Sequence, residues 1–412
     1  MLSWLKIAFG NIVKNRRRSL VTIFAVALGF ASVSLFQGYI HNTYSGLRNA
    51  AIRGEGLAHL TIYKKGWQLK GKIDPENHMF SREEIRTITN IVEEEDDVIL
   101  VTPQLQISGL VSNGRVSTIF IAKGVVPEDE RIIKGTWAAF RPVNGKRLSS
   151  TKEYGVEMAV DLAAILTISP GGDGVVMVTT PDGQMNALDI QVSGIYDTGT
   201  EATNDKYLRV PFTFAQSLYD TAKADRLVVL LDNWQKTEKA RIKIQQLLDD
   251  VGIACEIKTW NEQSLFYSKV RSMFDLIFLF IFSIVFVVVT MSVINTMGMA
   301  VLERTREIGT LRAIGVKRSG ISQLFAMEGA MLGLFGALFG VLLNCIVWAG
   351  IRFAELSYVP PGNSSSVPLI VGLLPKAMGG LALFLILLSL LAAIIPARRA
   401  AKLSVVEALA HV

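Results

Sequence analysis

The sequence has 412 residues, of which 50% are hydrophobic and 19% are charged, and its mean hydropathy is +0.38. This composition is too apolar for an ordinary soluble protein of this length and indicates a protein embedded in a lipid bilayer. The formal net charge of +6 would suit a nucleic-acid partner, but the basic residues gather beside long apolar segments. Lipid headgroups and membrane topology account for them there, so no nucleic-acid partner is expected.

Four segments are apolar and long enough to cross the membrane as helices, because a bilayer core of roughly 30 Å needs about 20 residues. They are residues 20–40, 276–302, 329–351 and 377–397. No comparable segment lies between the first and the second, so one large polar loop is expected there. The predicted fold class is a membrane protein with four transmembrane α-helices, two of them extended into a stalk, and a large α+β extracytoplasmic domain between helices 1 and 2.

Residues 1–19 precede the first span and contain several basic side chains. Leu5, Phe9 and Ile12 recur at i, i+4 and i+7, which predicts a cytoplasmic amphipathic helix lying on the inner leaflet. The apolar run that follows is about 21 residues long, whereas the apolar region of a cleavable signal peptide has about 7 to 15. An uncleaved membrane anchor is therefore expected.

Basic residues also flank the later spans, in the turn 303–320 and in the tail 398–412. By the positive-inside rule, both termini and this turn are predicted to be cytoplasmic. The large loop 54–258 and the short loop 352–376, which is rich in Pro, Gly and Ser, are then extracytoplasmic.

The helix of the first span is predicted to continue past the bilayer, so that it covers residues 20–53. Tyr44, Leu47 and Ala51 keep a helical spacing, and the segment RGEG at 53–56 ends it. Such a helix is roughly 50 Å long.

The second long helix is predicted to begin well before its apolar run, within residues 259–302. Thr259 and Glu262 stand at capping-box spacing, and no Gly or Pro follows until Gly298. A helix from Glu262 to Leu302 is on the order of 60 Å long, about twice the bilayer core. The two extended helices are predicted to form a stalk. The alternative is that the extensions are ordinary juxtamembrane helices joined to the loop domain by flexible turns.

Residues 54–258 are predicted to form an α+β domain of about 200 residues, which is large enough for its own core. Residues 174–196 are predicted to form a hairpin that turns at Pro181, Asp182 and Gly183. Its second strand places three apolar residues on one face, namely Leu188, Ile190 and Val192. Residues 233–252 are predicted to form a helix that ends before Gly252. Its inward side chains are predicted to be Ala240, Ile244 and Leu247.

No catalytic residue, cofactor site or metal site is predicted in this chain. Residues 66–73, GWQLKGKI, match most of a phosphate-binding loop, but Ile73 occupies the position of the hydroxyl that would hold Mg²⁺. The chain is therefore not expected to be an ATPase. The acidic run 93–97 is expected to form a solvated helix end. The charged residues in the spans, Asp275 and Glu328, lie near span ends, so no ion relay across the membrane is expected.

The turn 303–320, ERTREIGTLRAIGVKRSG, is predicted to contain a short amphipathic helix at the cytoplasmic surface. Ile308, Leu311 and Ile314 recur at i, i+3 and i+6, charged residues occupy the remaining surface, and Gly315 is placed to end the helix. Lipid anchoring and topology alone would account for the arginines. A tight helix between two spans is, in addition, stiff enough to transmit a push to both.

Three short motifs carry a resemblance to a known family. ERTREIGTLRAIG resembles the signature that follows the second span in the MacB/FtsX-type ABC permease family, and IPARRAAKLSVVEALAHV is similar to that family's C-terminal ending. Ser404 and Val405 stand where the family often has Asp-Pro. The segment GLAHLTIY after the first long helix resembles the lipoprotein-releasing LolC and LolE branch. The specific motifs cover about residues 295–320 and 390–410, while the layout of spans and loops covers essentially the whole chain.

The resemblance implies a coupling helix that docks on a separate ATP-binding subunit. Its residues would be Glu303, Arg304, Arg306, Glu307, Ile308, Gly309, Leu311, Arg312 and Gly315. Glu307 and Arg312 would contact the partner, the apolar residues would fill its groove, and Gly309 would allow close backbone approach. The outer domain would be divided into a porter-like and a second subdomain.

The function implied by the resemblance is that of a permease subunit that converts ATP hydrolysis by a cytoplasmic ABC ATPase dimer into periplasmic motion, or mechanotransmission. ATP and Mg²⁺ would bind the ATPase, and this chain would need no cofactor. The first expectation is release of lipoproteins from the bacterial inner membrane. One alternative is MacB-like export of peptides, antibiotics or lipids with an adaptor and an outer-membrane channel. A second alternative is an FtsX-like, non-transporting regulator of a periplasmic enzyme. A secondary transporter fits least, since the spans lack broken helices.

The resemblance also implies the partners and the location. The expected partners are the ATPase dimer, a second permease copy or a homologous permease, a periplasmic lipoprotein carrier or adaptor, and the lipid bilayer. The chain is expected to be a multi-pass protein of the inner membrane with both termini cytoplasmic.

Overall fold

The computed structural model describes residues 2–71, 73–135, 142–151, 153–360, 363–364 and 366–402. The chain forms two compact units. The first, called here the helical unit, contains Met1–Tyr44, Arg271–Ser357 and Pro368–Val412. The second, called here the α/β unit, contains Ser45–Val270 and Tyr358–Val367.

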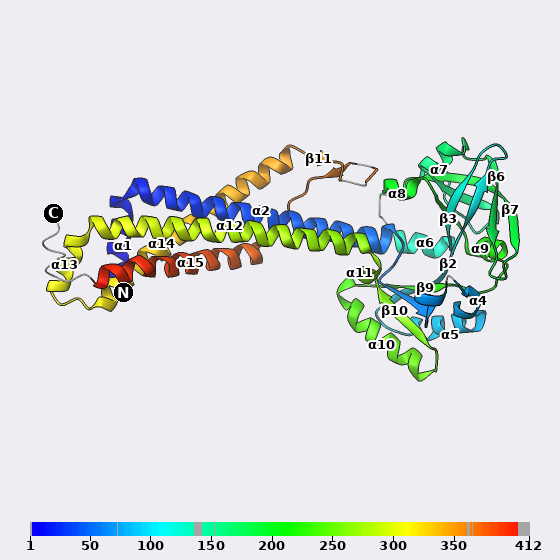
Figure 1. The fold of residues 1–412 in the computed structure, drawn as a ribbon, viewed down its shortest axis with the longest axis horizontal. Coiled ribbons are helices and arrows are strands. Elements are labelled where there is room, and N and C mark those ends of the chain that lie inside the picture. Colours follow the sequence, from blue (N-terminus) through cyan, green and yellow to red (C-terminus); the bar gives the residue numbers. More distant parts are fainter. Residues whose placement is uncertain are drawn as a thin grey trace. The chain divides into compact units, whose positions relative to one another are not determined.

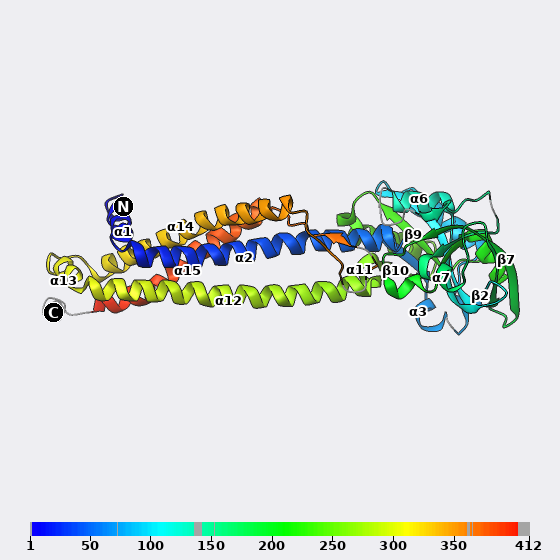
Figure 2. The same cartoon turned by 90° about the horizontal axis from the view of Figure 1, so that it is seen from above.

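Among the described residues, the helical unit contains all or most of two short and four long helices (Figure 1, Figure 2). The short ones are α1 (Leu2–Lys14) and α13 (Thr305–Ala313). The long ones are α2 (Arg16–Asn49), α12 (Leu265–Glu303), α14 (Arg318–Phe353) and α15 (Pro375–Lys402). All four long helices are candidate membrane spans by length and composition. They contain the four apolar segments identified in the sequence.

The first long helix ends where the sequence predicts. A π-helical turn at Ala50–Gly54 follows α2, and Gly56 then adopts a φ of +67°. The left-handed region is open to glycine without the steric cost that a Cβ would bring. Gly56, the last residue of the RGEG segment, therefore stops the helix.

The second long helix begins later than predicted. The Thr259–Glu262 capping box is present, but it opens a separate short helix, α11 (Trp260–Gln263). Ser264 then leaves helical geometry with a ψ of 87°, and its side chain accepts a hydrogen bond from the backbone N–H of Tyr267 at 3.4 Å. Ser264 thus acts as the N-cap of α12, because a serine hydroxyl can replace the missing backbone acceptor at a helix start. The prediction of one continuous helix from Glu262 to Leu302 was wrong.

Glycines bring α14 into close contact with two neighbouring helices. A Cβ on Gly333 would lie 2.9 Å from the Ser389 side chain of α15, and a Cβ on Gly340 would lie 2.6 Å from Cβ of Phe30 in α2. Gly329 and Gly336 are equally close to α15 and α2, respectively. Small residues at such positions let membrane helices approach backbone to backbone. The α14 helix therefore lies between α15 and α2.

The α/β unit contains one mixed sheet with strand order β10-β1-β9-β2-β3-β8-β5-β7-β4, and β6 pairs with β2 and β7. Its strands are β1 (Leu60–Lys64), β2 (Val98–Ser112), β3 (Ser117–Val125), β4 (Pro142–Gly145), β5 (Gly155–Ala159), β6 (Asp173–Thr179), β7 (Met185–Tyr196), β8 (Tyr207–Pro211), β9 (Arg226–Leu231) and β10 (Cys255–Thr259). Its helices are α3 (Trp67–Lys70), α4 (Pro75–His78), α5 (Arg82–Glu93), α6 (Pro127–Lys134), α7 (Val160–Ile165), α8 (Glu201–Asn204), α9 (Phe212–Tyr219), α10 (Thr237–Asp250) and α11. Two further short strands are β11 (Ser357–Tyr358) and β12 (Val367–Pro368).

The long strand β2 joins two separate hydrophobic cores. Its first part, from Val98 to Gln104, pairs with β9, and this region packs under α5 and α10 around Ile88 and Ile244. Its second part pairs with β3 and β6, and this region packs under α7 and α9 around Phe120. The α/β unit is thus one sheet with two cores.

The predicted hairpin of residues 174–196 is confirmed as β6 and β7. Val176 pairs with Leu188, and Gly183 in the turn has a φ of +83°. Ile190 and Val192 are buried on one face and Leu188 packs partly against the same core. The hairpin follows from alternating β-branched residues on either side of a turn that only glycine adopts readily.

The predicted helix of residues 233–252 is present as α10, but one inward residue was wrong. Ala240 and Ile244 are buried, whereas Leu247 is half-buried and Leu248 is fully buried. The buried face therefore follows i, i+4, i+8, because this helix packs on the sheet along a single four-residue row. Gly252 follows the helix end with a φ of +80°, as predicted.

The structure shows the conformation around two segments singled out in the sequence, residues 66–73 and the acidic run 93–97. The segment that resembles a phosphate-binding loop contains Gly66, with a φ of +86°, and the four-residue helix α3, while Lys72 lies outside the described residues. In the acidic run 93–97, Asp97 accepts from Lys236 at 2.6 Å and Glu95 pairs with Lys243 of α10. The acidic run is therefore partly neutralised by Lys236, which directly precedes α10, and by Lys243 within α10.

Candidate functional site: the predicted coupling helix and its polar network

The predicted coupling segment 303–320 contains the nine-residue helix α13, one residue after α12 ends at Glu303. Thr305 opens it, and its hydroxyl donates to the Val301 carbonyl at 3.0 Å. At the other end, Gly315 has a φ of +100°, and the N–H of Val316 donates to the Leu311 carbonyl at 3.0 Å. This is the left-handed helix ending that glycine favours.

Only part of the predicted apolar face is buried. Ile308 is 3% exposed, Gly309 is buried beside it and Leu311 is half-buried against the helical core. Ile314 was predicted to share this face, but it is 75% exposed. The helix ends at Ala313, so the i, i+3, i+6 spacing no longer applies at Ile314, and that part of the prediction was wrong.

A buried ion pair joins the junction of α12 and α13 to α14. Arg304 NH1 lies 2.9 Å from Glu328 Oε1, and Arg304 Nε donates to Glu307 Oε2 at 2.8 Å. Arg304 is 9% exposed and Glu328 is 3% exposed. Burial alone would lower the pKa of Arg304, but the bonds to the two carboxylates raise it above its ordinary value. Arg304 is therefore charged, and its guanidinium fixes the start of α13 against α14.

The N-terminal helix α1 adds a second set of polar contacts to the same junction. Asn11 donates to the Glu328 carboxylate, and Lys14 lies 3.4 Å from Glu307 Oε1. Arg18, in the first turn of α2, pairs with Glu303. The hydrogen bond from Arg304, with a further contribution from Lys14, lowers the pKa of Glu307 below its usual value. We call these side chains the junction network; they are Asn11, Lys14, Arg18, Glu303, Arg304, Glu307 and Glu328.

The packing of α1 differs from the predicted amphipathic face. Ala8 and Ile12 are buried, and Phe9 is 48% exposed although its ring lies 6.1 Å from that of Phe335 in α14. The side chain of Leu5 lies outside the described residues. The face of α1 that carries Ala8, Asn11 and Ile12 packs on the protein, so α1 is part of the helical unit. Sequence periodicity missed this contact because Asn11 reads as a polar surface residue.

The remaining predicted site residues lie elsewhere on α13. Arg306 is exposed, and Arg312 NH1 donates to the backbone carbonyl of Ala401 in α15 at 2.8 Å. Glu303, Arg304 and Glu307 therefore belong to the junction network, whereas Arg312 bonds to α15 instead. Sequence reasoning missed Glu328, Asn11 and Lys14. The one available signal was a carboxylate in an otherwise apolar span, which is costly unless it is paired.

Two family models together match most of the chain. Residues 19–247 match the MacB-like periplasmic core domain, and residues 279–405 match the FtsX-like permease C-terminal domain. The second match contains the whole of α13 and its junction with α14.

Individual relatives cover from half of this chain to nearly all of it. An uncharacterized ABC transporter permease of Methanocaldococcus jannaschii is 23% identical over 98% of this chain and 96% of its own length. The lipoprotein-releasing system transmembrane protein LolC of Neisseria meningitidis is 24% identical over 79% of this chain and 81% of its own length. The macrolide export ATP-binding/permease protein MacB of Chromobacterium violaceum is 29% identical over 50% of this chain and 31% of its own length. Among solved structures, the periplasmic region of MacB from Actinobacillus actinomycetemcomitans is 16% identical, covers 51% of this chain and 92% of that one, and has a TM-score of 0.37.

Proposed function

Because the chain belongs to the family of MacB-like and FtsX-like ABC transporter permeases, we propose that it converts ATP hydrolysis by a cytoplasmic ATPase dimer into motion of its periplasmic domain. It is the permease component, and the family implies the separate ATPase. ATP and Mg²⁺ would bind that ATPase. An ATPase dimer presents two equivalent surfaces, so a second permease copy or a homologous permease would complete the assembly.

The junction network is the observation that carries this proposal. A push on α13 would reach α14 through the Arg304–Glu328 pair and reach α12 through the single residue between the two helices. The helices α2 and α12 each contain residues of both compact units, and neither helix is interrupted at the unit boundary. A continuous helix is stiff along its axis, so motion started at α13 would pass along α12 into the α/β unit.

For the contact with the ATPase, Ile314 is the best-placed apolar residue. It is 75% exposed, it directly follows α13, and Gly315 holds the turn in which it lies. The Glu307 carboxylate and the Arg312 guanidinium already have contacts inside this chain, so their roles would be to position α13 as well as to meet the partner. Side chains that become fully buried in a pocket of the partner usually contribute most to such interfaces.

We propose lipoprotein release from the inner membrane as the activity, with both termini in the cytoplasm and a periplasmic lipoprotein carrier or adaptor as a further partner. The similarity to LolC over 79% of this chain supports this choice. MacB-like export of peptides, antibiotics or lipids is the second candidate, supported by the MacB relatives. An FtsX-like regulator of a periplasmic enzyme is the third.

The docking test compares two exposed isoleucines. In the full chain purified with its candidate ATPase, Ile314→Asp should reduce the amount of ATPase retained by about tenfold or more, because a carboxylate would be buried in an apolar groove. Ile242→Asp is the matched control, since Ile242 is 51% exposed on α10. Equal retention by both variants would exclude Ile314 as the anchor.

The coupling test uses the same complex with a labelled lipoprotein in proteoliposomes. Glu307→Gln and Arg312→Gln should leave ATP hydrolysis running while lipoprotein release falls several-fold, because both side chains hold α13 in place. Unchanged release in both variants would contradict the coupling role. Active hydrolysis with release of a peptide and no lipoprotein would favour the export alternative.

A further inference from the structure

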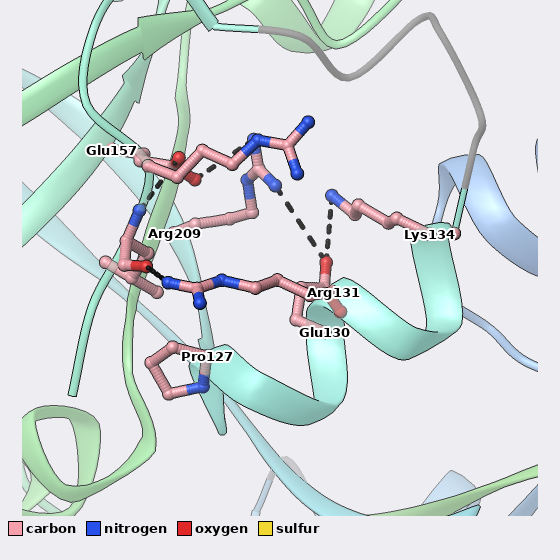
Figure 3. A pocket seen from close by; sticks show the side chains of 9 residues that line it. Pro127, Glu130, Arg131, Lys134, Glu157 and Arg209 are labelled. Atoms are coloured by element: carbon pink, nitrogen blue, oxygen red, sulfur yellow. Dashed lines mark hydrogen bonds and ion pairs between the residues drawn. The ribbon is translucent and has the colours of Figure 1, made fainter.

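A charged pocket in the α/β unit has no role in the proposal above. It lies between α6, β5, β8 and the segment around Leu148 (Figure 3). Six of its nine lining residues are charged. They are Glu130, Arg131, Lys134, Arg147, Glu157 and Arg209.

Two of the cationic groups, Arg209 and Lys134, are held in place by neighbouring side chains. Arg209 NH2 lies 3.1 Å from Glu157, and its guanidinium stacks 3.8 Å from the ring centre of Tyr196. Lys134 Nζ lies 2.8 Å from Glu130 Oε1. Figure 3 shows Lys134 and Glu130 on α6 facing Arg209 and Glu157 from the two strands. A site whose donors are already ordered loses little entropy when a ligand binds.

Arg131 and Leu148 connect the two walls of the pocket. Arg131 NH2 donates to the carbonyl of Leu148 at 3.1 Å, and the N–H of Leu148 donates to Glu157 at 3.0 Å. A guanidinium has five N–H donors, so the single contact recorded for Arg131 among the described residues leaves it able to bind a ligand as well.

Stability alone is a poor explanation for this cluster. Glu130, Lys134, Glu157 and Arg209 are each more than nine-tenths buried. Removing charges from water costs several kcal/mol per ion by order of magnitude, and apolar residues of similar volume are often at least as stabilising. Perturbed charges that border a pocket are instead typical of binding sites.

The charge balance selects the sign of the ligand. Four cationic side chains face two carboxylates, so 4 − 2 leaves a formal charge of +2 when Lys134 is protonated. We propose that this pocket binds a single phosphate-type oxyanion, contacted by Arg131, Lys134 and Arg147. Arginine suits this task, because its planar donors match the oxygens of a phosphate group in a two-point contact. The phosphate could come from free inorganic phosphate or from a lipid headgroup.

The pocket helix is attached to the end of the first stalk helix. Arg53, in the π-helical turn that follows α2, donates to the carbonyl of Ile133 at 3.1 Å. Ile133 directly precedes Lys134. Occupancy of the pocket should therefore slow amide hydrogen exchange in the turn Ala50–Gly54 as well as in α6.

The binding test uses the full chain in a neutral detergent, titrated with inorganic phosphate by calorimetry at constant ionic strength set with chloride. Arg131→Gln and Arg147→Gln should each weaken phosphate binding by about tenfold, because each removes one charge-assisted contact. Both arginines are exposed, so these variants should unfold at the wild-type temperature. Arg115→Gln is the matched control, because Arg115 is an exposed arginine of the same unit, and it should bind phosphate as the wild type does.

The pH dependence identifies the contribution of Lys134. Burial, together with the nearby Arg209, lowers the pKa of Lys134 to about 7, although the carboxylates beside it favour the charged form. The charged groups that surround it are Glu130 and Arg131 on α6, Glu157 on β5, Arg209 on β8 and Arg147. Sulfate is the probe for this test, because its own charge does not change near neutrality. As Lys134 loses its proton, the affinity of the wild type for sulfate should fall several-fold from pH 6 to pH 8. The affinity of Lys134→Gln for sulfate should stay constant over the same range.

A second experiment distinguishes free inorganic phosphate from a lipid headgroup as the natural ligand. Micelles doped with phosphatidylglycerol should compete with inorganic phosphate if the natural ligand is a headgroup. Saturable binding of the doped micelles without binding of inorganic phosphate, lost in the Arg131→Gln, Arg147→Gln double variant, would assign the pocket to lipid. Equal phosphate binding by the wild type and both arginine variants, or no binding of either probe, would overturn the proposal.

Discussion

At the residue scale, the Arg304–Glu328 pair is the contact that most constrains the predicted coupling helix. The two residues are separated by 24 positions and meet only because α13 and the following turn reverse the chain. The pair is almost fully buried, and Asn11 and Glu307 complete its hydrogen bonds. A buried ion pair adds little net stability compared with apolar packing. Removal of one partner is nevertheless destabilising, because the other charge stays buried in a low dielectric with less compensation.

We expect Glu328→Ala to lower the free energy of unfolding of the detergent-solubilised chain by up to about 3 to 5 kcal/mol, because buried Arg304 would keep only the half-exposed Glu307 as a carboxylate partner. Arg304→Met combined with Glu328→Leu should recover most of that loss. The measurement is the denaturant midpoint, followed by circular dichroism.

Lys317→Gln is the control for this cycle, because Lys317 is an exposed cation in the same turn. It should leave the midpoint unchanged. If Glu328→Ala is as stable as the wild type, the pair does not hold α13 to α14.

At the element scale, α14 is organised by two pairs of glycines. Gly329 and Gly333 face α15, and Gly336 and Gly340 face α2. The four-residue spacing within each pair is visible in the sequence and is typical of closely packed membrane helices. The spacing does not say which helix each pair meets, and that assignment comes from the packing of three helices.

We expect Gly340→Ala to destabilise the helical unit by about 1 to 3 kcal/mol, because the added methyl group would overlap Phe30. Gly350→Ala, in the same helix, meets no atom within 4 Å. It should be neutral or stabilising by up to about 1 kcal/mol, since alanine is the better helix former. Thermal unfolding of both variants in detergent gives the comparison, and an equal midpoint for the two would argue against close α2–α14 packing.

At the scale of the whole molecule, part of the loop between α14 and α15 folds with the α/β unit. Ser364 donates to Asp197 Oδ1 at 2.7 Å, and Thr200 forms a β-bridge with Asn363. Asn204 and the N–H of Gly199 also donate to Asp197. Besides α2 and α12, this loop is thus a further segment by which the chain of the helical unit enters the α/β unit.

We expect acid to release this loop. Partial burial alone would raise the pKa of Asp197, but the bonds from Ser364, Asn204 and Gly199 outweigh it and lower the pKa below the usual value. A carboxyl with a depressed folded-state pKa stabilises the fold above its unfolded pKa of about 3.9, and the stabilisation is lost as pH falls through the folded pKa. Amide exchange at Asn363 and Ser364 should therefore speed up only below about pH 4.

Asp197→Asn should show the faster exchange already at neutral pH, because its amide keeps the shape and lacks the charge. Asp205→Asn is the control, since Asp205 is exposed and lies outside this set of bonds. Identical protection of the loop in both variants would show that Asp197 does not hold it.

Features that depend on neighbouring residues could be predicted from the sequence alone. Span length, the hairpin around Gly183, the glycine endings at Gly56, Gly252 and Gly315, and the motif in 303–320 all follow from local spacing and local conformational cost. Hydrophobicity and capping act over a few residues, so a single sequence reports them directly.

The folded structure was needed to learn which distant side chains meet. It replaced Leu247 by Leu248 in the core, exposed Ile314, made Ser264 the true start of α12, and brought Arg304 to Glu328. It also assembled the charged pocket from α6, β5 and β8, whose charged residues are scattered along the sequence. Such pairings depend on how whole elements pack, and the burial that makes a charge need a partner exists only once the chain has folded.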